Sequence, residues 1–387
     1  MDKLAASCFL QHGEQFSQTF KLYPLQRSTS PQPPGKRSAV SMVRCAAPYA
    51  ASAAGTATKA TSSVDVVTGR HANPQGADGV VLSGTAASFD FDRYLSANAK
   101  AVHQALDLAM QGLRCPEVLS ESMRYSVLAG GKRLRPALAI AACELVGGAA
   151  AGAVPVACAA EMIHTASLIH DDMPCMDDDA LRRGRPSNHV AYGEPTALLA
   201  GDALLAFAFE HVARGCAGAG VPADRALRAV LELGSAAGVG GVAAGQVADM
   251  ASEGAPSGSV SLAALEYIHV HKTARLVEAA AVSGAIVGGA GDADVERVRR
   301  YAHFVGLLLQ VVDDVLDVTA TSEQLGKTAG KDAAAGKATY TRLMGLEGAR
   351  AYVDELLAKA EAELDGFDAV RAAPLLHLAR FIAYRQH

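Results

Sequence analysis

Residues 154–179 read VPVACAAEMIHTASLIHDDMPCMDDD, an apolar run that ends abruptly in aspartates. The run is apolar around most of its circumference, which is typical of a helix buried inside a bundle. We therefore expect a helix over residues 154–173. Because Pro174 breaks the helical pattern, the chain can bulge there and carry Asp177 back beside Asp171.

The composition of the whole chain also favours helices. The protein has 387 residues, of which 50% are hydrophobic, 5% aromatic and 19% charged. Alanine dominates the apolar share, and a chain with few aromatic and β-branched clusters favours packed helices over a sheet. We predict an all-α fold in one helical domain over residues 88–387. The helices are expected at residues 89–111, 116–129, 135–147, 154–173, 196–216, 222–250, 261–288, 292–318, 338–364 and 373–384.

The first ninety residues differ from the rest of the chain. They are rich in Ser, Thr, Ala, Pro and Gln, and residues 1–45 hold six basic and two acidic side chains. This is the composition of an organelle transit peptide, and no apolar segment of the secretory type is present. The sequence VRCAA at 43–47 resembles a chloroplast processing site. We expect a transit peptide over 1–45, a flexible leader over 46–87 and a location in the plastid stroma; an unprocessed tail is the alternative.

The remaining counts exclude several classes of protein. Loss of residues 1–45 takes the net charge from −5 to about −9, and such an acidic chain is a poor candidate for nucleic acid binding. The apolar stretch 145–160 is too short and too broken to span a bilayer, so no transmembrane segment is expected. The seven cysteines show no CxxC or zinc spacing and are expected to be mostly buried free thiols. Cys175 is interpreted as an apolar filler, with a redox role as the alternative.

A second acidic cluster lies in LLLQVVDDVLDVT at 307–319. Asp313 and Asp317 are four residues apart and share a helix face with Gln310, whereas Asp314 is expected to point elsewhere. Carboxylates that converge at the ends of apolar helices repel one another unless a cation lies among them. Either cluster alone could be a solvated helix end, but the two together favour a site for Mg²⁺, which is completed by waters and substrate phosphates.

Basic residues punctuate the same regions. They occur in GGKRLRP at 130–136, directly after the first acidic cluster, in HVHKTARL at 269–276 and in LGKTAGKDAAAGKATY at 325–340. Each could be an ordinary solvated side chain. Together with the carboxylates, they indicate a site for two polyphosphates, one bridged through metal and one held directly by Arg and Lys.

These motifs, with GQVADM at 245–250, stand in an order and spacing that resemble the trans-prenyltransferase family, specifically plastid-type geranylgeranyl diphosphate synthases. The resemblance covers about residues 125–345. It implies an isoprenoid-synthase-type helical bundle around a central substrate cavity, usually assembled as a homodimer. A heteromer with a regulatory small subunit is a further partner that the resemblance allows.

The resemblance also implies roles for individual residues. About three Mg²⁺ ions per active site would be bound by Asp171, Asp177, Asp313 and Asp317, with Asp172 and Asp314 as supporting neighbours. The diphosphate of isopentenyl diphosphate would be held by Lys132, Arg135, His164 and Arg183. The allylic diphosphate would be held by Arg182, Lys272, Lys327 and Lys337, with Thr273 and Gln310 lining the reacting carbon. Without the motif, His164 would be interpreted as a satisfied core histidine.

The length of the product depends on the helix upstream of Asp171. Ser167 and Ala166, four and five residues before it, are small and would form no floor. Met162 and Ile163 lie one turn deeper, about 5.4 Å or one isoprene unit. We therefore expect a C20 product, made from dimethylallyl, geranyl or farnesyl diphosphate. The alternatives are a longer-chain polyprenyl diphosphate synthase and a non-catalytic partner subunit, which would be expected to lose some of these ligands.

Overall fold

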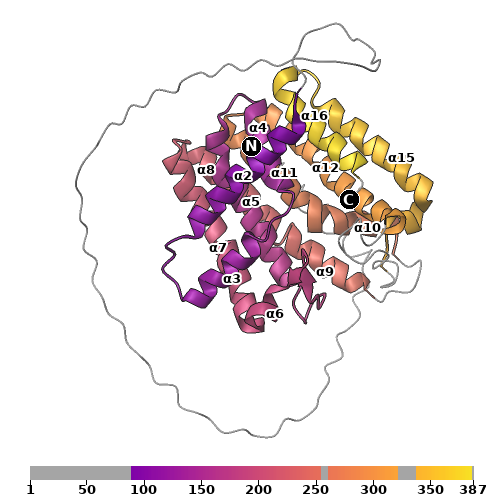
Figure 1. The fold of residues 1–387 in the computed structure, drawn as a ribbon. Helices are drawn as coiled ribbons and strands as arrows, with labels where there is room; N and C mark the ends of the chain where they lie inside the picture. Colours follow the sequence, from indigo (N-terminus) through magenta and orange to yellow (C-terminus); the bar gives the residue numbers. More distant parts are fainter. Residues whose placement is uncertain (1–88, 254–259, 321–336, 386–387) are drawn as a thin grey trace, which may run out of the picture. The chain divides into compact units, whose positions relative to one another are not determined.

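The computed structural model describes residues 89–253, 260–320 and 337–385. The chain divides into two units, Met1–Ala86 and Ala87–His387, and only the second contains described residues. The expected transit peptide and leader, and Lys327, lie outside the described residues. The described residues of the second unit form helices joined by loops and one short hairpin (Figure 1), which confirms the predicted all-α fold.

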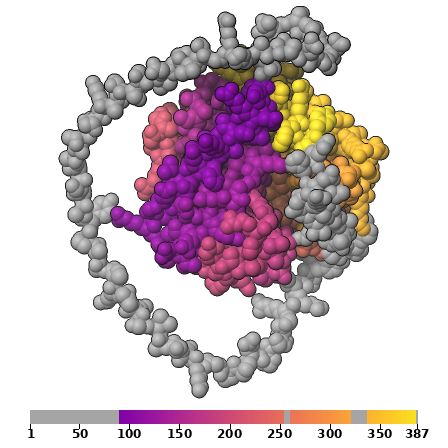
Figure 2. Space-filling view, in the orientation of Figure 1, coloured from indigo at the N-terminus to yellow at the C-terminus, as the bar shows by residue number. Residues whose placement is uncertain are grey.

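The helices form a bundle in which α5 and α11 lie at the centre. The first of these packs against α7 and α4, and the second against α4, α8 and α12. α15 and α16 lie side by side in yellow in Figure 1, and the N-terminal helices form much of the face seen in Figure 2. The long helices are α2 (Phe91–Met110), α3 (Glu117–Val127), α4 (Leu134–Leu145), α5 (Ala150–Asp171), α7 (Glu194–Gly218), α8 (Ala223–Ala237), α9 (Val242–Ser252), α11 (Arg275–Gly288), α12 (Asp292–Thr319), α15 (Tyr340–Glu363) and α16 (Ala369–Tyr384).

The predicted helix over 222–250 is wrong in one respect, because it is two helices. α8 ends at Ala237 and α9 begins at Val242, with the glycine-rich segment 238–241 between them. Gly241 has non-helical angles (φ −141°, ψ −129°), and a Cβ atom on it would lie 1.8 Å from the carbonyl oxygen of Ala236. Only glycine permits this close approach, so the chain turns here and α9 runs toward the site.

The predicted helix over 261–288 is continuous but not uniform. α10 (Leu262–His269) is followed by a π-helical turn, η1 (Val270–Ala274), which leads directly into α11. A short hairpin, β1 (Leu181–Arg182) and β2 (Arg185–Pro186), and the helix α6 (Asn188–Tyr192) follow α5 and were not predicted.

Three segments are long and apolar enough to cross a membrane by length and composition, so the argument from residues 145–160 does not hold for the whole chain. In α5, 72% of the most apolar 18-residue stretch is buried inside the bundle. In α7 the buried share is 33%, and over Ala223–Ser252 it is 28%. The apolar character of α5 is therefore explained by the core, whereas α7 and α8 keep apolar surface uncovered.

Candidate active site

The loop that follows α5 brings two predicted aspartates together. The helix ends at Asp171, and the backbone N–H of Asp177 donates to the carbonyl oxygen of Asp171 at 2.9 Å. The turn that contains Pro174 thus returns the chain as the sequence predicted. Burial raises the pKa of Asp171, Lys272 opposes this shift, and the charge of Asp177 adds to it. Cys175 is exposed in this loop, so its interpretation as an apolar filler is wrong.

Lys272 lies between two carboxylates from different helices. Its Nζ atom is 3.6 Å from Oδ1 of Asp171 and donates to Oδ2 of Asp249 at 2.7 Å. Burial lowers the pKa of Lys272, but the nearby charges of Asp171 and Asp249 outweigh this and raise it. The sequence assigned no role to Asp249, although it lies in the quoted motif GQVADM. The available signal was a carboxylate within the same motif, one helical turn after Gly245 and Gln246.

The π-helical turn η1 sets the direction of Lys272 and Thr273. Both line the large cavity beside α5, and Lys272 also lines a second cavity beside α12. Two glycines allow neighbouring helices to approach the turn. A Cβ atom on Gly245 of α9 would lie 2.1 Å from the backbone nitrogen of Lys272, and one on Gly306 of α12 would lie 2.5 Å from the Cβ of the last residue of the turn. π turns of this kind are frequent at functional sites.

The second acidic cluster lines the second cavity, which measures about 210 Å³. Gln310, Asp313 and Asp314 all face it, so the expectation that Asp314 points elsewhere is wrong. Asp314 also accepts a hydrogen bond from the backbone N–H of Tyr340 at 2.7 Å, which anchors the start of α15. Asp317 is buried one turn further on, is not among the residues lining the cavity, and its Oδ1 atom has no hydrogen-bond partner within the described ranges.

Two more cations meet carboxylates at the second cavity. Arg385 donates to Oδ1 of Asp313 at 2.8 Å. No motif in the sequence pointed to this arginine, because it lies 72 residues from its partner at the end of α16. Lys337 lines the same cavity and is 3.3 Å from Glu253. The structure thus brings Asp313 and Asp314 together with Lys272 and Lys337 around one space.

Three of the residues expected to bind isopentenyl diphosphate, Arg135, His164 and Arg183, also converge. Burial lowers the pKa of Arg135, and the charge of Arg183 lowers it further. The Nε atom of Arg135 is buried and has no hydrogen-bond partner in the part of the chain described. Burial, followed by the charges of Arg135 and Arg183, places the pKa of His164 well below its usual range. Lys132 lies instead near Arg385 and Asp313: burial and the charge of Arg385 lower its pKa, Asp313 opposes this shift, and its Nζ atom stands 5.9 Å over the ring of Phe381. A cluster with an unsatisfied buried donor and mutually repelling cations is suited to an anion.

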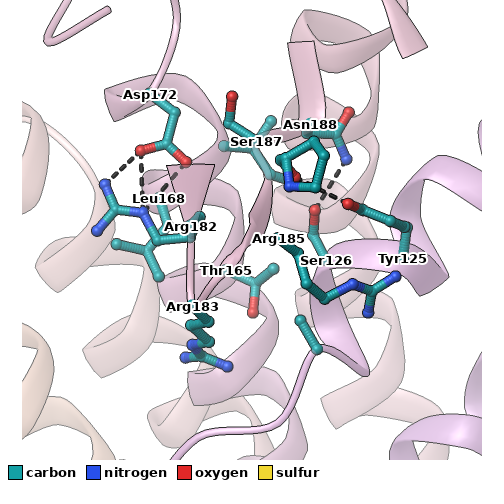
Figure 3. A pocket seen from close by; sticks show the side chains of 13 residues that line it. Tyr125, Ser126, Thr165, Leu168, Asp172, Arg182, Arg183, Arg185, Ser187 and Asn188 are labelled. Carbon is teal, nitrogen blue, oxygen red and sulfur yellow. Dashed lines mark hydrogen bonds and ion pairs between the residues drawn. The ribbon is translucent and has the colours of Figure 1, made fainter. Parts of the chain in front are cut away.

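The β1–β2 hairpin delivers one of these cations (Figure 3). Its turn residues Arg183 and Gly184 have φ values of 54° and 73°, and positive φ at both positions is what a type I′ turn requires. The guanidinium of Arg183 donates to the carbonyl oxygen of Gly130. Arg182 instead turns back onto Asp172, to which its Nε atom donates at 3.0 Å and 3.2 Å. These two expected site residues are therefore paired with each other beneath the hairpin.

Contacts with α3 and α6 hold the hairpin in place. The guanidinium of Arg185 lies 4.1 Å from the ring centre of Tyr125, whose hydroxyl donates to the carbonyl oxygen of Pro186 at 2.8 Å. Asn188 donates to Oγ of Ser126 at 2.8 Å. The small cavity enclosed by these residues measures about 30 Å³. The hairpin is thus fixed to the bundle on one side and presents Arg183 on the other.

The large cavity, about 420 Å³, runs along the face of α5 upstream of Asp171. Ile163, Ala166 and Ser167 line it as the sequence predicted, but Met162 is fully buried in the core and is not among the lining residues. The opposite wall comes from helices to which the sequence assigned no role. Its α9 residues are Val242, Ala243, Gln246, Val247 and Met250, and α7 and α8 add Leu205 and Ala237.

The carboxylates of the site fit Mg²⁺ only together with a phosphate ligand. Within the described ranges, no group of three or more His, Cys, Asp or Glu side chains could hold a metal ion unaided. The available donors are carboxylate oxygens at the end of α5 and near the end of α12, chiefly Asp171 with Asp177 and Asp313. Mg²⁺ is typically bound by one or two carboxylates, several waters and substrate phosphates, so this donor set suits it.

Comparisons with known proteins agree with this geometry. A family model described as "Polyprenyl synthetase" matches residues 116–372. The chain is 57% identical over 300 residues to "Heterodimeric geranylgeranyl pyrophosphate synthase large subunit 1, chloroplastic" of Arabidopsis thaliana, which covers 78% of this chain and 81% of that one. It is 56% identical over 299 residues to "Geranylgeranyl pyrophosphate synthase, chloroplastic" of Capsicum annuum, covering 77% and 80%.

The solved structures point the same way. The crystal structure of an FPP/GFPP synthase from Zymomonas mobilis superposes with a TM-score of 0.67 at 34% sequence identity, covering 76% of this chain and 98% of that one. A putative farnesyl-diphosphate synthase from Marinomonas gives a TM-score of 0.65 at 35% identity, covering 76% and 99%. These likenesses confirm the predicted isoprenoid-synthase-type bundle.

Proposed function

The chain belongs to the polyprenyl synthetase family, and from this premise we propose that it condenses isopentenyl diphosphate with an allylic diphosphate to make geranylgeranyl diphosphate, a C20 product. One observation carries the proposal. Lys272 pairs with Asp171 at the end of α5 and lines the same cavity as Asp313 and Asp314 of α12, and a mostly apolar cavity of about 420 Å³ leads away from Asp171 along α5. A diphosphate at the carboxylates would therefore place its prenyl tail in the cavity.

Asp171, Asp177 and Asp313 would hold Mg²⁺ together with the allylic diphosphate, with Asp317 behind them. Mg²⁺ bound there supplies positive charge that stabilises the diphosphate as it leaves. Lys272, charged because Asp171 and Asp249 raise its pKa, adds a fixed cation on the same side. Lys337 stands across the second cavity, where it can contact the same anion.

The basic cluster would bind the diphosphate of isopentenyl diphosphate. Lys132, Arg135 and Arg183 supply donors, and the buried Nε atom of Arg135 is one that a phosphate oxygen can satisfy. His164 is neutral near pH 7 because its pKa is well below the usual range, so it can donate or accept one hydrogen bond without adding charge. This arrangement fixes the second substrate against the first.

Chemistry in such a site requires no side-chain nucleophile. Breaking the allylic C–O bond leaves a carbocation, which the alkene of isopentenyl diphosphate attacks, and a proton then leaves for the released diphosphate. Thr273 and Gln310 line the two cavities near Lys272, where their oxygen atoms can face the positive carbon. Closing these substrates off from water protects the cation from hydrolysis.

The small residues on α5 support a C20 product. Ala166 and Ser167 leave the first turn of the cavity open, and Ile163 and His164 line the wall one turn further along α5. A C15 stop would need a bulky residue at one of the two small positions. The chloroplast is the proposed location, since relatives such as those from Arabidopsis thaliana and Capsicum annuum are named chloroplastic.

A second copy of the chain is the proposed partner. α7 is apolar, but only 33% of its most apolar 18-residue stretch is buried. Leu198 and Leu199 on α7 are 46% and 58% exposed, and Leu227 and Leu231 on α8 are 70% and 69% exposed. Exposed apolar residues mark an interaction surface when they form a contiguous patch, and we propose that these four leucines do so. One relative is named a heterodimeric large subunit, so a related small subunit is the other occupant to test.

The test is to incubate the purified protein with farnesyl diphosphate, labelled isopentenyl diphosphate and Mg²⁺, and to size the alcohols released by phosphatase. A single C20 alcohol supports the proposal. A ladder of longer alcohols would make the protein a longer-chain synthase, and binding of both substrates without product would make it a partner subunit.

A further inference from the structure

One buried carboxylate lies at the centre of the basic cluster. Glu161 is on α5, and its side chain is 3% exposed. Its Oε1 atom accepts a hydrogen bond from Arg133, whose side chain is also 3% exposed, and lies 3.9 Å from the guanidinium of Arg183. Its charge also raises the pKa of Arg135, against the larger effect of burial. Three arginines thus surround one carboxylate.

Both arginines that Glu161 contacts have a strained backbone. Arg133 has φ 52° and Arg183 has φ 54°, in the left-handed region that residues other than glycine rarely adopt. Such conformations persist when the surroundings hold them, and they cluster at functional sites. Each guanidinium has a second anchor in the backbone. Arg133 donates to the carbonyl oxygen of Val127, the last residue of α3, at 2.6 Å, and Arg183 donates to that of Gly130 in the α3–α4 connection.

Glu161 therefore joins two segments that are distant in sequence. One is the loop before α4, which carries Lys132 and leads to Arg135, and the other is the β1–β2 hairpin. The guanidinium of Arg183 lies directly on Gly131, where an added Cβ would be 2.7 Å from it. The loop and the hairpin meet at this point, and Glu161 lies beneath both.

We propose that Glu161 is a positioning residue that sets the isopentenyl diphosphate site by clamping Arg133 and Arg183; this rests on the proposed function. Arg133 cannot reach the substrate, since it is buried against Glu161. The substrate would be bound by Arg135, Arg183 and Lys132. The carboxylate itself would repel a diphosphate, so its role is to hold the cations rather than to bind the ligand.

Positioning and simple electrostatics make opposite predictions, which allows a sharp test. Glu161→Gln removes one negative charge from a site for an anion. If Glu161 acted only through its charge, the KM for isopentenyl diphosphate would fall. If it positions the arginines, that KM rises by about tenfold or more, as expected for the loss of one charge-assisted hydrogen bond to the diphosphate. The KM for farnesyl diphosphate should stay within about twofold, because Lys272 and the aspartates are untouched.

Glu278→Gln is the matched control. Glu278 has the same 3% exposure, accepts from Arg275 at 3.1 Å and pairs with His303 at 2.8 Å, but it lies on α11 and lines none of the described cavities. Both variants should lose thermal stability, since each removes the charge of a buried carboxylate from its paired side chains; Arg275 and His303 are partly exposed, so Glu278→Gln should lose less than Glu161→Gln. Only Glu161→Gln should change the KM for isopentenyl diphosphate.

The experiment measures steady-state kinetics for both substrates and calorimetric binding of isopentenyl diphosphate, for the wild type and each variant. An unchanged or lowered KM in Glu161→Gln, or an equal rise in Glu278→Gln, would overturn the inference. Should Glu161→Gln fail to fold, Glu161→Asp keeps the charge but shortens the reach, and it should raise the same KM. A wild type that binds isopentenyl diphosphate but transfers no prenyl group would refute the proposed function, while the binding measurements would still decide the role of Glu161.

Discussion

Replacing Gly245 with alanine should damage catalysis more than stability. The added Cβ atom would lie 2.1 Å from the backbone nitrogen of Lys272 and 2.6 Å from its Cα, whereas ordinary contacts begin at 3.4 Å. The π-helical turn and α9 must therefore separate by about 1.3 Å, and a displacement of about 1 Å can cost about 100-fold in rate. Because Lys272 and Thr273 both move with the turn, we expect kcat/KM for farnesyl diphosphate to fall by about 100-fold, or about 2.7 kcal/mol.

The stability cost of Gly245→Ala should be smaller. Overpacking typically costs about 1–3 kcal/mol, and the better helix propensity of alanine returns up to about 1 kcal/mol. Gly284→Ala is the matched control, because its Cβ would lie 1.9 Å from the carbonyl oxygen of Ala139. Gly284 lies on α11 roughly 16 Å along the helix from Thr273. It should lose comparable stability while kcat/KM changes little.

The assay combines thermal unfolding of both variants with steady-state kinetics well below their melting temperatures. If Gly245→Ala kept kcat/KM within about threefold of the wild type, the turn would not need its tight packing. If Gly284→Ala lost as much activity as Gly245→Ala, the effect would come from general loosening of the bundle.

The other predictions concern the metal ligands, the tail cavity and a buried histidine. Asp171→Ala or Asp313→Ala should lower kcat by orders of magnitude while circular dichroism stays helical, and near-normal turnover of either would contradict the metal assignment. Ala166→Phe should fill the cavity beside Asp171 and shift the product below C20, and unchanged prenols would place the floor elsewhere. Burial lowers the pKa of His269 from 6.5 to about 4. As pH falls below 6.5, His269 is therefore protonated in the unfolded state but stays neutral in the folded state, which lowers the free energy of unfolding. The wild type should therefore lose about 2 kcal/mol more unfolding free energy than His269→Gln between about pH 7.5 and pH 5; urea unfolding that gives the two proteins the same pH dependence would refute this.

The helices and the pairing of the first aspartates were predictable from local sequence. An apolar run followed by Asp171, Pro174 and Asp177 indicates a helix end and a bulge, because periodicity and the proline ring act over a few residues. Motif order then pointed to Lys272 and the basic cluster. Each of these predictions rests on residues within one segment, or on motifs whose order and spacing resemble those of a known family.

The partners that complete the site could not be predicted in this way. Glu161 with Arg183, Lys272 with Asp249 and Asp313 with Arg385 join residues that lie far apart in the sequence. The same holds for the π turn, whose place depends on Gly245 and Gly306 in other helices.

Local pattern determines which residues are helical and which face is apolar, and this was enough for the fold class and the chemistry. It does not determine which faces meet. Met162 and Ile163 are neighbours on α5 and both belong to the core, yet only Ile163 also lines the cavity, because α9 forms the opposite wall on that side of the helix. The chain-length cavity, the direction of Asp314 and the clamp around Glu161 are thus consequences of helix packing, which joins groups that no local pattern relates.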